Sequence, residues 1–531
     1  MEAIPKVETA NNHAALVEVL RNLFSPIAPS LLIVEAGQER NLGTVASESR
    51  PKRIVQWRHQ GVSLGGEPTV YKSERVESSV TKMPIPLREN IGSDIAIVMP
   101  TALPLEGKGV VVRSARSLLP GSQKPVGFVP TALDRDTRLA DIILCWSILD
   151  NFYPYFAEEG VDWDEALDVA LRAAAINQNE IEFTNTLSRM IASLHDGHGT
   201  VFAGDQWHNA LPVRWDWVEG HLVVTKVGSG ADGLKVGDIV LKIDGQPIAK
   251  LVREATPDIP AATEQAKAVK LAEVLAQTRN NEPVPIEVRR RPGVTVKARV
   301  APVDYVPSNL ETFGHQTIES VGPGVWYVDL RRLTQQQLQS HMKELSKARA
   351  VVFDVRGRPS DAGFDLLPHL LKRAAHSQQF DVAIRTAPTR TPTTFLHGGY
   401  ELQPKPPSLR GTFAFLADGN AISRAETVLG LVRDSHLGII VGSTTAGTNG
   451  NINTISLPAN FAIVWTGLRT RQPDGARFMG IGIKPDITAR RTIDGVLTGR
   501  DDVLQAALGA LATQPHASRR QHAASGNRLG H

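Results

Sequence analysis

The spacing of apolar residues changes along the chain and predicts several structural regions. In residues 1–130, short stretches of alternating apolar and polar residues lie between glycines and prolines, which favours a β-rich N-terminal accessory region. Over residues 131–205 the apolar positions recur at the 3.6-residue spacing of a helix, which predicts a bundle of about three helices. A length of 531 residues agrees with several domains, since about 150 residues per domain is usual.

Strand-like alternation returns in residues 206–310, and from 311 to 512 strands alternate with helices. The second pattern predicts a largely parallel sheet covered by helices, with ligand and catalytic groups at the carboxyl ends of its strands. We expect FDVAIRT (380–386) to be one of its strands and DLLPHLLKRAA (365–375) one of its helices. Residues 513–531 are polar and predict a disordered tail. The fold class is therefore multidomain α/β, or α+β overall.

Composition excludes several classes of function. The 58 basic and 55 acidic side chains leave a net charge of +3, not the domain-scale basic field that nucleic acid requires. No apolar run approaches the length of a membrane span. The single cysteine, Cys145, cannot form an intrachain disulfide or a thiolate zinc site, and we expect no metal or other cofactor. Without a recognisable signal peptide the chain as written is expected in the cytoplasm; a start further upstream would leave an extracytoplasmic location open.

Ser423 is a candidate nucleophile because of its place in the predicted core. It follows an apolar strand and a DGN turn, and it opens an amphipathic helix, whose N-terminus stabilises negative charge. That place suits an alkoxide. However, Ser423 to Glu426 also forms the S-x-x-E pattern of a helix capping box, which needs no catalytic role. From the local sequence alone, capping is the favoured interpretation.

A nucleophilic serine needs a base, and His198 is the histidine with the most distinctive surroundings. It lies in a glycine-flanked turn, LHDGHG, which ends the predicted helical bundle. A metal site with His195 is the weaker interpretation, because Asp196 is the only nearby carboxylate and no third ligand is indicated. A packing or capping role for His198 is the remaining alternative.

One segment of the β-rich region after residue 206 resembles a PDZ domain. The stretch Gly233 to Ile248, GLKVGDIVLKIDGQPI, has the leucine under a turn, the GD pair, the strand and the DG hairpin of that module. The helical stretch Ile259 to Arg279 takes the place of the helix that flanks the PDZ groove. Such a module offers a sheet edge to an extended peptide. A β module without a ligand is the alternative.

Several motifs occur in one order over residues 134–511. They are LHDGH at 194–198, the PDZ-like stretch at 233–245, DVRG at 354–357, SRAE at 423–426, GSTTAG at 442–447, PDG at 473–475 and GIKPDI at 482–487. As a set they resemble the tail-specific or C-terminal processing serine peptidases and their relative, the tricorn core protease. The resemblance implies a serine-type peptidase that hydrolyses extended or carboxyl-terminal polypeptide segments. The PDZ-like module would help to bind that polypeptide partner.

The family that the chain resembles has two branches, which differ in the residue that acts as the catalytic base. The C-terminal processing branch has a lysine in a G-K-G loop, where this chain has Thr448; the tricorn-like branch has a histidine that matches His198. The resemblance therefore implies that Ser423 is the nucleophile and His198 the general base and then acid. We expect the backbone amides of Arg424 and Gly357 to bind the oxyanion.

Some positions depart from the tricorn pattern. Gly197 and Met479 stand where that pattern has a serine and a glutamate, so no residue that orients His198 is identified. Arg358 replaces an asparagine; with Asn449 it is a candidate substrate-binding residue, suited to a carboxylate, and a solvated loop arginine is the alternative. These departures leave two other functions open: a peptidase-fold binding protein without turnover, and a serine hydrolase of a non-peptide ester or amide.

Overall fold

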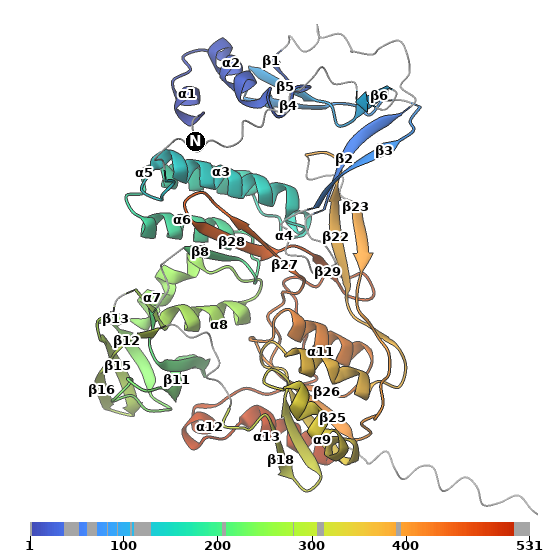
Figure 1. Cartoon of the computed structure of the whole chain (residues 1–531). Helices are drawn as coiled ribbons and strands as arrows, with labels where there is room; N and C mark the ends of the chain where they lie inside the picture. The colour runs from blue at the N-terminus through green and yellow to red at the C-terminus, as the bar shows by residue number, and fades with distance from the viewer. Residues whose placement is uncertain are drawn as a thin grey trace, which may run out of the picture.

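The structure, a computed structural model, describes the chain from residue 3 to residue 513 with gaps (Figure 1). The described residues are 3–36, 53–60, 72–81, 83–92, 94–106, 109–110, 129–203, 209–279, 281–304, 313–388 and 394–513. The predicted disordered tail lies outside them, apart from residue 513. The order of elements follows the predicted regions, and the exact domain boundaries stay a prediction.

The N-terminal region combines two helices with strands of two sheets. Its elements are α1 (Ile4–Glu8), α2 (His13–Phe24), β1 (Leu32–Glu35), β2 (Ile54–Gln60), β3 (Lys72–Ser78), β4 (Leu87–Ile91), β5 (Ile95–Met99), β6 (Leu103–Glu106) and β7 (Gly109–Val110). Strands β1, β5 and β4 form one sheet, and β2 pairs with β3 and β6 in another. Strand β2 also pairs antiparallel with β22 (Gln379–Arg385), so the N-terminal region shares a sheet with a distant part of the chain.

The predicted helical bundle is present and ends at the His198 turn. It contains α3 (Arg135–Phe152), the short α4 (Phe156–Glu159), α5 (Trp163–Ile176) and α6 (Glu180–Ala192). Their apolar faces share one core with strand β28 (Phe461–Thr466). Strand β8 (Thr200–Ala203), just after the turn, pairs with β28, which also pairs with β27 (Ile452–Ser456). This small sheet brings a late part of the chain against the His198 turn (Figure 1).

The PDZ-like module is a sheet of order β10-β11-β12-β15-β16 flanked by helices. Its strands are β10 (Val213–Val218), β11 (His221–Val227), β12 (Ile239–Ile243), β13 (Gln246–Pro247), β15 (Val284–Arg291) and β16 (Val294–Val300), and its helices are α7 (Ile248–Ala255), the 3₁₀ turn Thr256–Asp258 and α8 (Glu264–Leu275). The predicted DG hairpin joins β12 to β13, with both Asp244 and Gly245 at positive φ. A separate small sheet joins β9 (Asn209–Ala210), β14 (Gln277–Thr278) and β17 (Val303–Asp304).

The α/β core contains the predicted, largely parallel sheet. Its order is β18 (Ile318–Gly322), β19 (Val325–Asp329), β20 (Ala350–Asp354), β25 (Thr412–Ala417), β26 (Ile439–Gly442) and β30 (Ile487–Thr488). All neighbours from β19 to β30 are parallel, and only β18 is antiparallel. Helices α9 (Gln335–Lys347) and α11 (Arg424–Asp434) pack on one face, and α13 (Asp502–Thr513) packs on the other, with α12 (Ile493–Thr498) nearby. The loops after β20 and β25 therefore lie at the same edge of the sheet.

Two predictions for the core are wrong. The strand predicted at 380–386 forms, as β22, but it belongs to an antiparallel sheet with β2, β23 (Thr394–Gly398) and β29 (Arg469–Arg471). The helix predicted at 365–375 is replaced by α10 (Asp361–Asp365) and a 3₁₀ turn at Leu367–Leu370, followed by β21 (Ala375–His376), which pairs with β24 (Glu401–Leu402). Pro368 explains this second error, because proline has no N–H to donate inside a helix.

Candidate active site

Ser423 lies at a sharp turn between strand β25 and helix α11. Its backbone has φ 60° and ψ −118°, a conformation rare for a residue with a side chain. The Ser423 N–H donates to the Thr448 carbonyl (2.9 Å), and the Ser423 carbonyl accepts from the N–H of Glu426 (2.9 Å). The hydroxyl makes no capping hydrogen bond with α11. The capping-box interpretation is therefore wrong for this side chain.

Glu426 binds the neighbouring loop after β26. Its fully buried carboxylate accepts hydrogen bonds from the Thr445 hydroxyl, from the Gly447 N–H (2.7 Å) and from the Thr448 N–H (2.9 Å). Burial raises the pKa of Glu426 to about 8, although these donors act in the opposite direction. Glu426 thus joins the first turn of α11 to the loop after β26, and that loop binds the backbone of Ser423.

His198 is oriented by a hydroxyl and a buried carboxylate. Its ring Nδ1 lies 2.8 Å from the Thr466 Oγ1, and the Thr466 hydroxyl donates to Asp196 Oδ1 (2.6 Å). The Thr466 N–H also donates to Asp196 Oδ2 (2.6 Å), and the His198 N–H donates to Asp196 Oδ1 (2.9 Å). Because the only hydroxyl hydrogen of Thr466 goes to the carboxylate, the ring must supply the hydrogen of the bond between Nδ1 and Oγ1. This assigns the tautomer with the lone pair on Nε2, as a general base requires.

The surroundings of His198 keep its ring neutral. Burial, with the positive charges of Lys270 and Arg358, lowers the pKa of His198 to about 4, although the Asp196 carboxylate acts in the opposite direction. The lysine is close because its Nζ donates to the carbonyl of Gly199, the next residue in the chain (3.2 Å). At neutral pH the imidazole is therefore the free base.

Thr448 connects the Ser423 turn with the His198 turn. Its carbonyl accepts from the Ser423 N–H, while its hydroxyl oxygen accepts from the Gly197 N–H (3.2 Å) and lies 3.6 Å from the sulfur of Met479. A Cβ atom on Gly197 would lie 2.3 Å from the Thr448 Oγ1, so no larger residue fits there without a shift. Of the positions that depart from the family patterns, Thr448 thus contacts two others, Gly197 and Met479.

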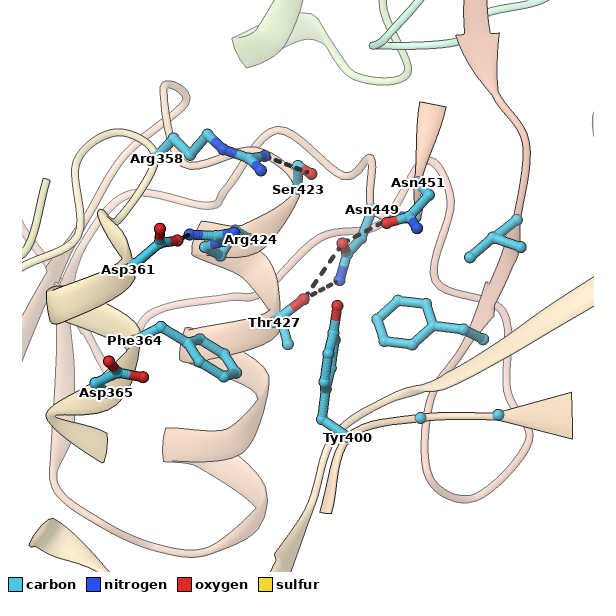
Figure 2. A pocket seen from close by; sticks show the side chains of 15 residues that line it. Arg358, Asp361, Phe364, Asp365, Tyr400, Ser423, Arg424, Thr427, Asn449 and Asn451 are labelled. Carbon is cyan, nitrogen blue, oxygen red and sulfur yellow. Dashed lines mark hydrogen bonds and ion pairs between the residues drawn. The ribbon is translucent and has the colours of Figure 1, made fainter. Parts of the chain in front are cut away.

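The Ser423 hydroxyl is bound by Arg358. Arg358 Nη1 donates a hydrogen bond to the Ser423 hydroxyl oxygen at 3.3 Å (Figure 2). Among the described residues, the side-chain hydrogen bond of His198 goes to Thr466 and not to Ser423. Arg424 is the first residue of α11, where a helix leaves its N–H groups without internal partners. The N–H of Gly357 donates to the Val355 carbonyl (2.9 Å), so it must give up that bond to reach an oxyanion.

A pocket of about 440 Å³ adjoins Ser423 (Figure 2). Asn449, which is buried, lines it and is oriented by two hydrogen bonds: its amide donates to the Thr427 hydroxyl (2.9 Å) and its oxygen accepts from the Gly450 N–H (2.8 Å). The pocket also has apolar walls, which Phe364, Phe380, Tyr400 and Leu468 contribute. It brings the two predicted substrate-binding residues, Arg358 and Asn449, together with the predicted nucleophile.

The described residues contain no group of three or more histidine, cysteine or acidic side chains that could bind a metal ion. Among the same residues, no helix has both the length and the apolar character needed to cross a membrane. Cys145 is buried in the core of the helical bundle.

Comparison with known proteins agrees with this architecture. Residues 324–489 match peptidase family S41, and residues 207–309 match a PDZ domain. The chain thus contains an S41 peptidase domain and a PDZ domain. No curated protein sequence matches it at a significant level.

Solved structures share the fold of this chain at low identity. Mature CPAF is 14% identical with a TM-score of 0.57, over 71% of this chain and 96% of that chain; mature CPAF complexed with lactacystin is 14% identical with a TM-score of 0.58, over 71% and 98%. The photosystem II D1 C-terminal processing protease is 14% identical, with a TM-score of 0.40, over 66% and 93%. At this identity the CPAF likeness shows the fold alone.

Several residues that bind the two turns of the candidate site were not predicted from the sequence. Thr466 and Lys270 gave no signal, because each lies in an ordinary strand or helix far along the chain from His198. Asp196 and Glu426 did stand in conspicuous motifs. We interpreted the first as the weak neighbour of a metal site and the second as a helix cap, whereas both are buried carboxylates that bind the two turns.

Proposed function

We propose that this protein hydrolyses peptide bonds by a Ser–His mechanism, with Ser423 as nucleophile and His198 as general base and then acid. The observation that carries the proposal is the bond of His198 Nδ1 to Thr466, which leaves the lone pair on Nε2. Thr448 binds the Ser423 and Gly197 backbones and so joins the two turns. A positioned base contributes about 10² to 10⁴ in rate.

The acylation step requires the Ser423 hydroxyl to change its partner. In the structure it accepts from Arg358, a guanidinium that can instead bind an anionic group of the substrate. When that exchange takes place, His198 Nε2 accepts the hydroxyl proton as Ser423 Oγ attacks the scissile carbonyl carbon. The proton then passes from His198 to the leaving amine, and water repeats the sequence on the acyl-enzyme. The Arg424 N–H, at the positive end of α11, is the proposed amide donor to the oxyanion.

Arg358 points to a carboxyl-terminal segment as substrate. Its guanidinium lines the pocket beside Ser423 and is close to a second cation, Arg424, which is paired with Asp361. Burial and the Arg424 charge lower the pKa of Arg358, as expected for a cation that a carboxylate would stabilise. We infer that an extended polypeptide binds with its free carboxyl group near Arg358, and with a side chain between Asn449 and the aromatic walls.

Replacement of Ser423 by alanine tests the mechanism. Ser423→Ala is expected to lower kcat for peptide cleavage by about 10⁴-fold or more, because the remaining groups have no nucleophile to activate. Circular dichroism checks that the fold is kept, and a fluorophosphonate should label Ser423 in the parent protein. Cleavage by Ser423→Ala at the parent rate would exclude the assignment. Absence of both labelling and turnover in the parent would favour a binding protein, and cleavage of small esters but of no peptide would favour a non-peptide hydrolase.

A matched pair of peptides tests the substrate class. For peptides that differ only in a free or an amidated carboxyl terminus, Arg358→Gln is expected to lower kcat/KM of the free acid about 10- to 100-fold more than that of the amide, because one charge-assisted contact is lost. Arg410→Gln, at an exposed arginine outside the pocket, is the control. Equal losses for both peptides would show that Arg358 does not bind the terminal carboxylate.

A further inference from the structure

Two tryptophans of this chain join the strand and the helix between which a PDZ domain binds a peptide. The peptide groove of a PDZ domain lies between a sheet-edge strand and a helix, here β10 and α8. The Trp215 indole N–H on β10 donates to the Ala272 carbonyl on α8 (2.7 Å), and the Trp217 indole N–H donates to the Ala268 carbonyl (3.0 Å). Trp215 is only 7% exposed. The two indoles fasten the helix to the strand where a peptide would otherwise lie.

Helix α8 also contacts the loop that joins the two active-site turns. The Thr263 hydroxyl, at the start of the helix, donates to the Ala446 carbonyl (2.8 Å), and the Gln265 amide donates to the Thr445 carbonyl (2.8 Å). The fit is close, since a Cβ atom on Gly447 would lie 2.7 Å from the Thr263 methyl group. Helix α8 is therefore braced between the PDZ sheet and the loop that contains Thr448.

Lys270 extends from this braced helix to the His198 turn. Its ammonium donates to the Gly199 carbonyl (3.2 Å), and it lies in the electrostatic field of two carboxylates, Asp196 in the turn and Glu273 on its own helix. Burial lowers the pKa of Lys270 to about 8, which leaves it mostly charged at neutral pH. It is a cation outside the substrate pocket, bound to the backbone next to the proposed base.

We propose that Lys270 is a positioning residue of the active site, which binds the Gly199 carbonyl and places a positive charge beside the His198 ring. This inference rests on the proposed role of His198. The bond fixes the backbone just after the histidine, and the charge opposes protonation of the ring. The PDZ domain thereby supplies a fixed part of the catalytic centre, and the tryptophans on β10 keep that part in place.

The charge effect separates this role from a merely structural one. Three charged groups act on His198: Asp196 favours its protonation, while Lys270 and Arg358 oppose it. Lys270→Met is therefore expected to move the acid limb of the pH profile of kcat/KM to higher pH by at least about half a unit. The lost hydrogen bond is also expected to lower kcat about tenfold with little change in KM. Lys267→Met, on the same helix, removes a lysine paired with Glu264 and is the control.

Lys270→Arg is the second variant in the experiment, because it retains the positive charge at this position. The acid limb is expected to stay at the parent position in Lys270→Arg even where kcat falls. A limb that stays in place in Lys270→Met, or that moves equally in both variants, would overturn the proposal. The outcome is distinct from failure of the proposed function, which Ser423→Ala reports independently of the pH profile.

Discussion

The two turns that form the proposed catalytic centre are stabilised in different ways. The Ser423 turn is bound by its own part of the chain: Glu426 on the same helix binds the loop at Thr448, 22 positions later. The His198 turn depends on distant segments, because Thr466 is 268 positions away and Lys270 is 71 positions from Gly199. The nucleophile is thus a local feature of the core, whereas the base is oriented by the assembly of several regions.

The two turns also differ in the strain of their backbones. The positive φ of Ser423 is a strained conformation that costs about 1 to 3 kcal/mol, and it persists only where surrounding contacts determine it. The buried Glu426 network supplies such contacts. His198 itself is not among the residues with positive φ, and its precision comes from hydrogen bonds to side chains. We therefore expect substitutions near His198 to change catalysis more than folding.

The substitution Thr466→Val tests this expectation, and we expect a large decrease in kcat. Valine keeps the shape but removes the hydroxyl between the ring and Asp196, so the ring loses its orientation and its fixed tautomer. We expect kcat to fall about 10²-fold, within the range that a positioned base contributes. Peptide hydrolysis and thermal unfolding would be measured on the same preparations.

Thr466→Ser is the matched control, because it retains the hydroxyl. It is expected to keep most of the parent activity. If the valine variant were as active as the serine variant, the hydroxyl would not orient the base, and the His198 turn would be no more dependent on distant contacts than the Ser423 turn.

The position of Ser423 could be predicted from the sequence, whereas the contacts that orient His198 could not. An apolar strand, a DGN turn and an amphipathic helix are patterns within about twenty residues, and they placed Ser423 at the carboxyl edge of a parallel sheet. Thr466 lies in strand β28, where nothing in the alternation of residues distinguishes it from its neighbours. Its pairing with Asp196 exists only after β28 has packed beside β8.

The departures from the family patterns also depend on contacts that the sequence alone does not reveal. Taken one at a time, Thr448, Gly197 and Met479 each indicate a missing catalytic group. In the folded chain Thr448 contacts the other two: it accepts from the Gly197 N–H, touches Met479, and occupies the space that a side chain at position 197 would need. The orientation of His198 comes instead from Thr466 and Asp196. Substitutions that are coupled by contact cannot be interpreted singly from one sequence.

The pH profile of the parent protein gives the smallest expected change and the sharpest test of the His198 surroundings. Protonation of His198 removes the lone pair on Nε2, so kcat/KM falls as the pH falls through the pKa of the ring. With that pKa at about 4, kcat/KM at pH 5 should remain about nine-tenths of its neutral value, whereas a histidine with an unperturbed pKa would leave only a few per cent.

Because the unfolded chain binds this proton more readily, the free energy of unfolding also decreases as the pH falls from about 6.5 towards 4. Near-UV circular dichroism at each pH separates that loss from titration of the base. A half-maximal point near pH 6.5 with the fold intact would mean that the ring is solvated as an isolated histidine is, and that the distant contacts do not set its charge.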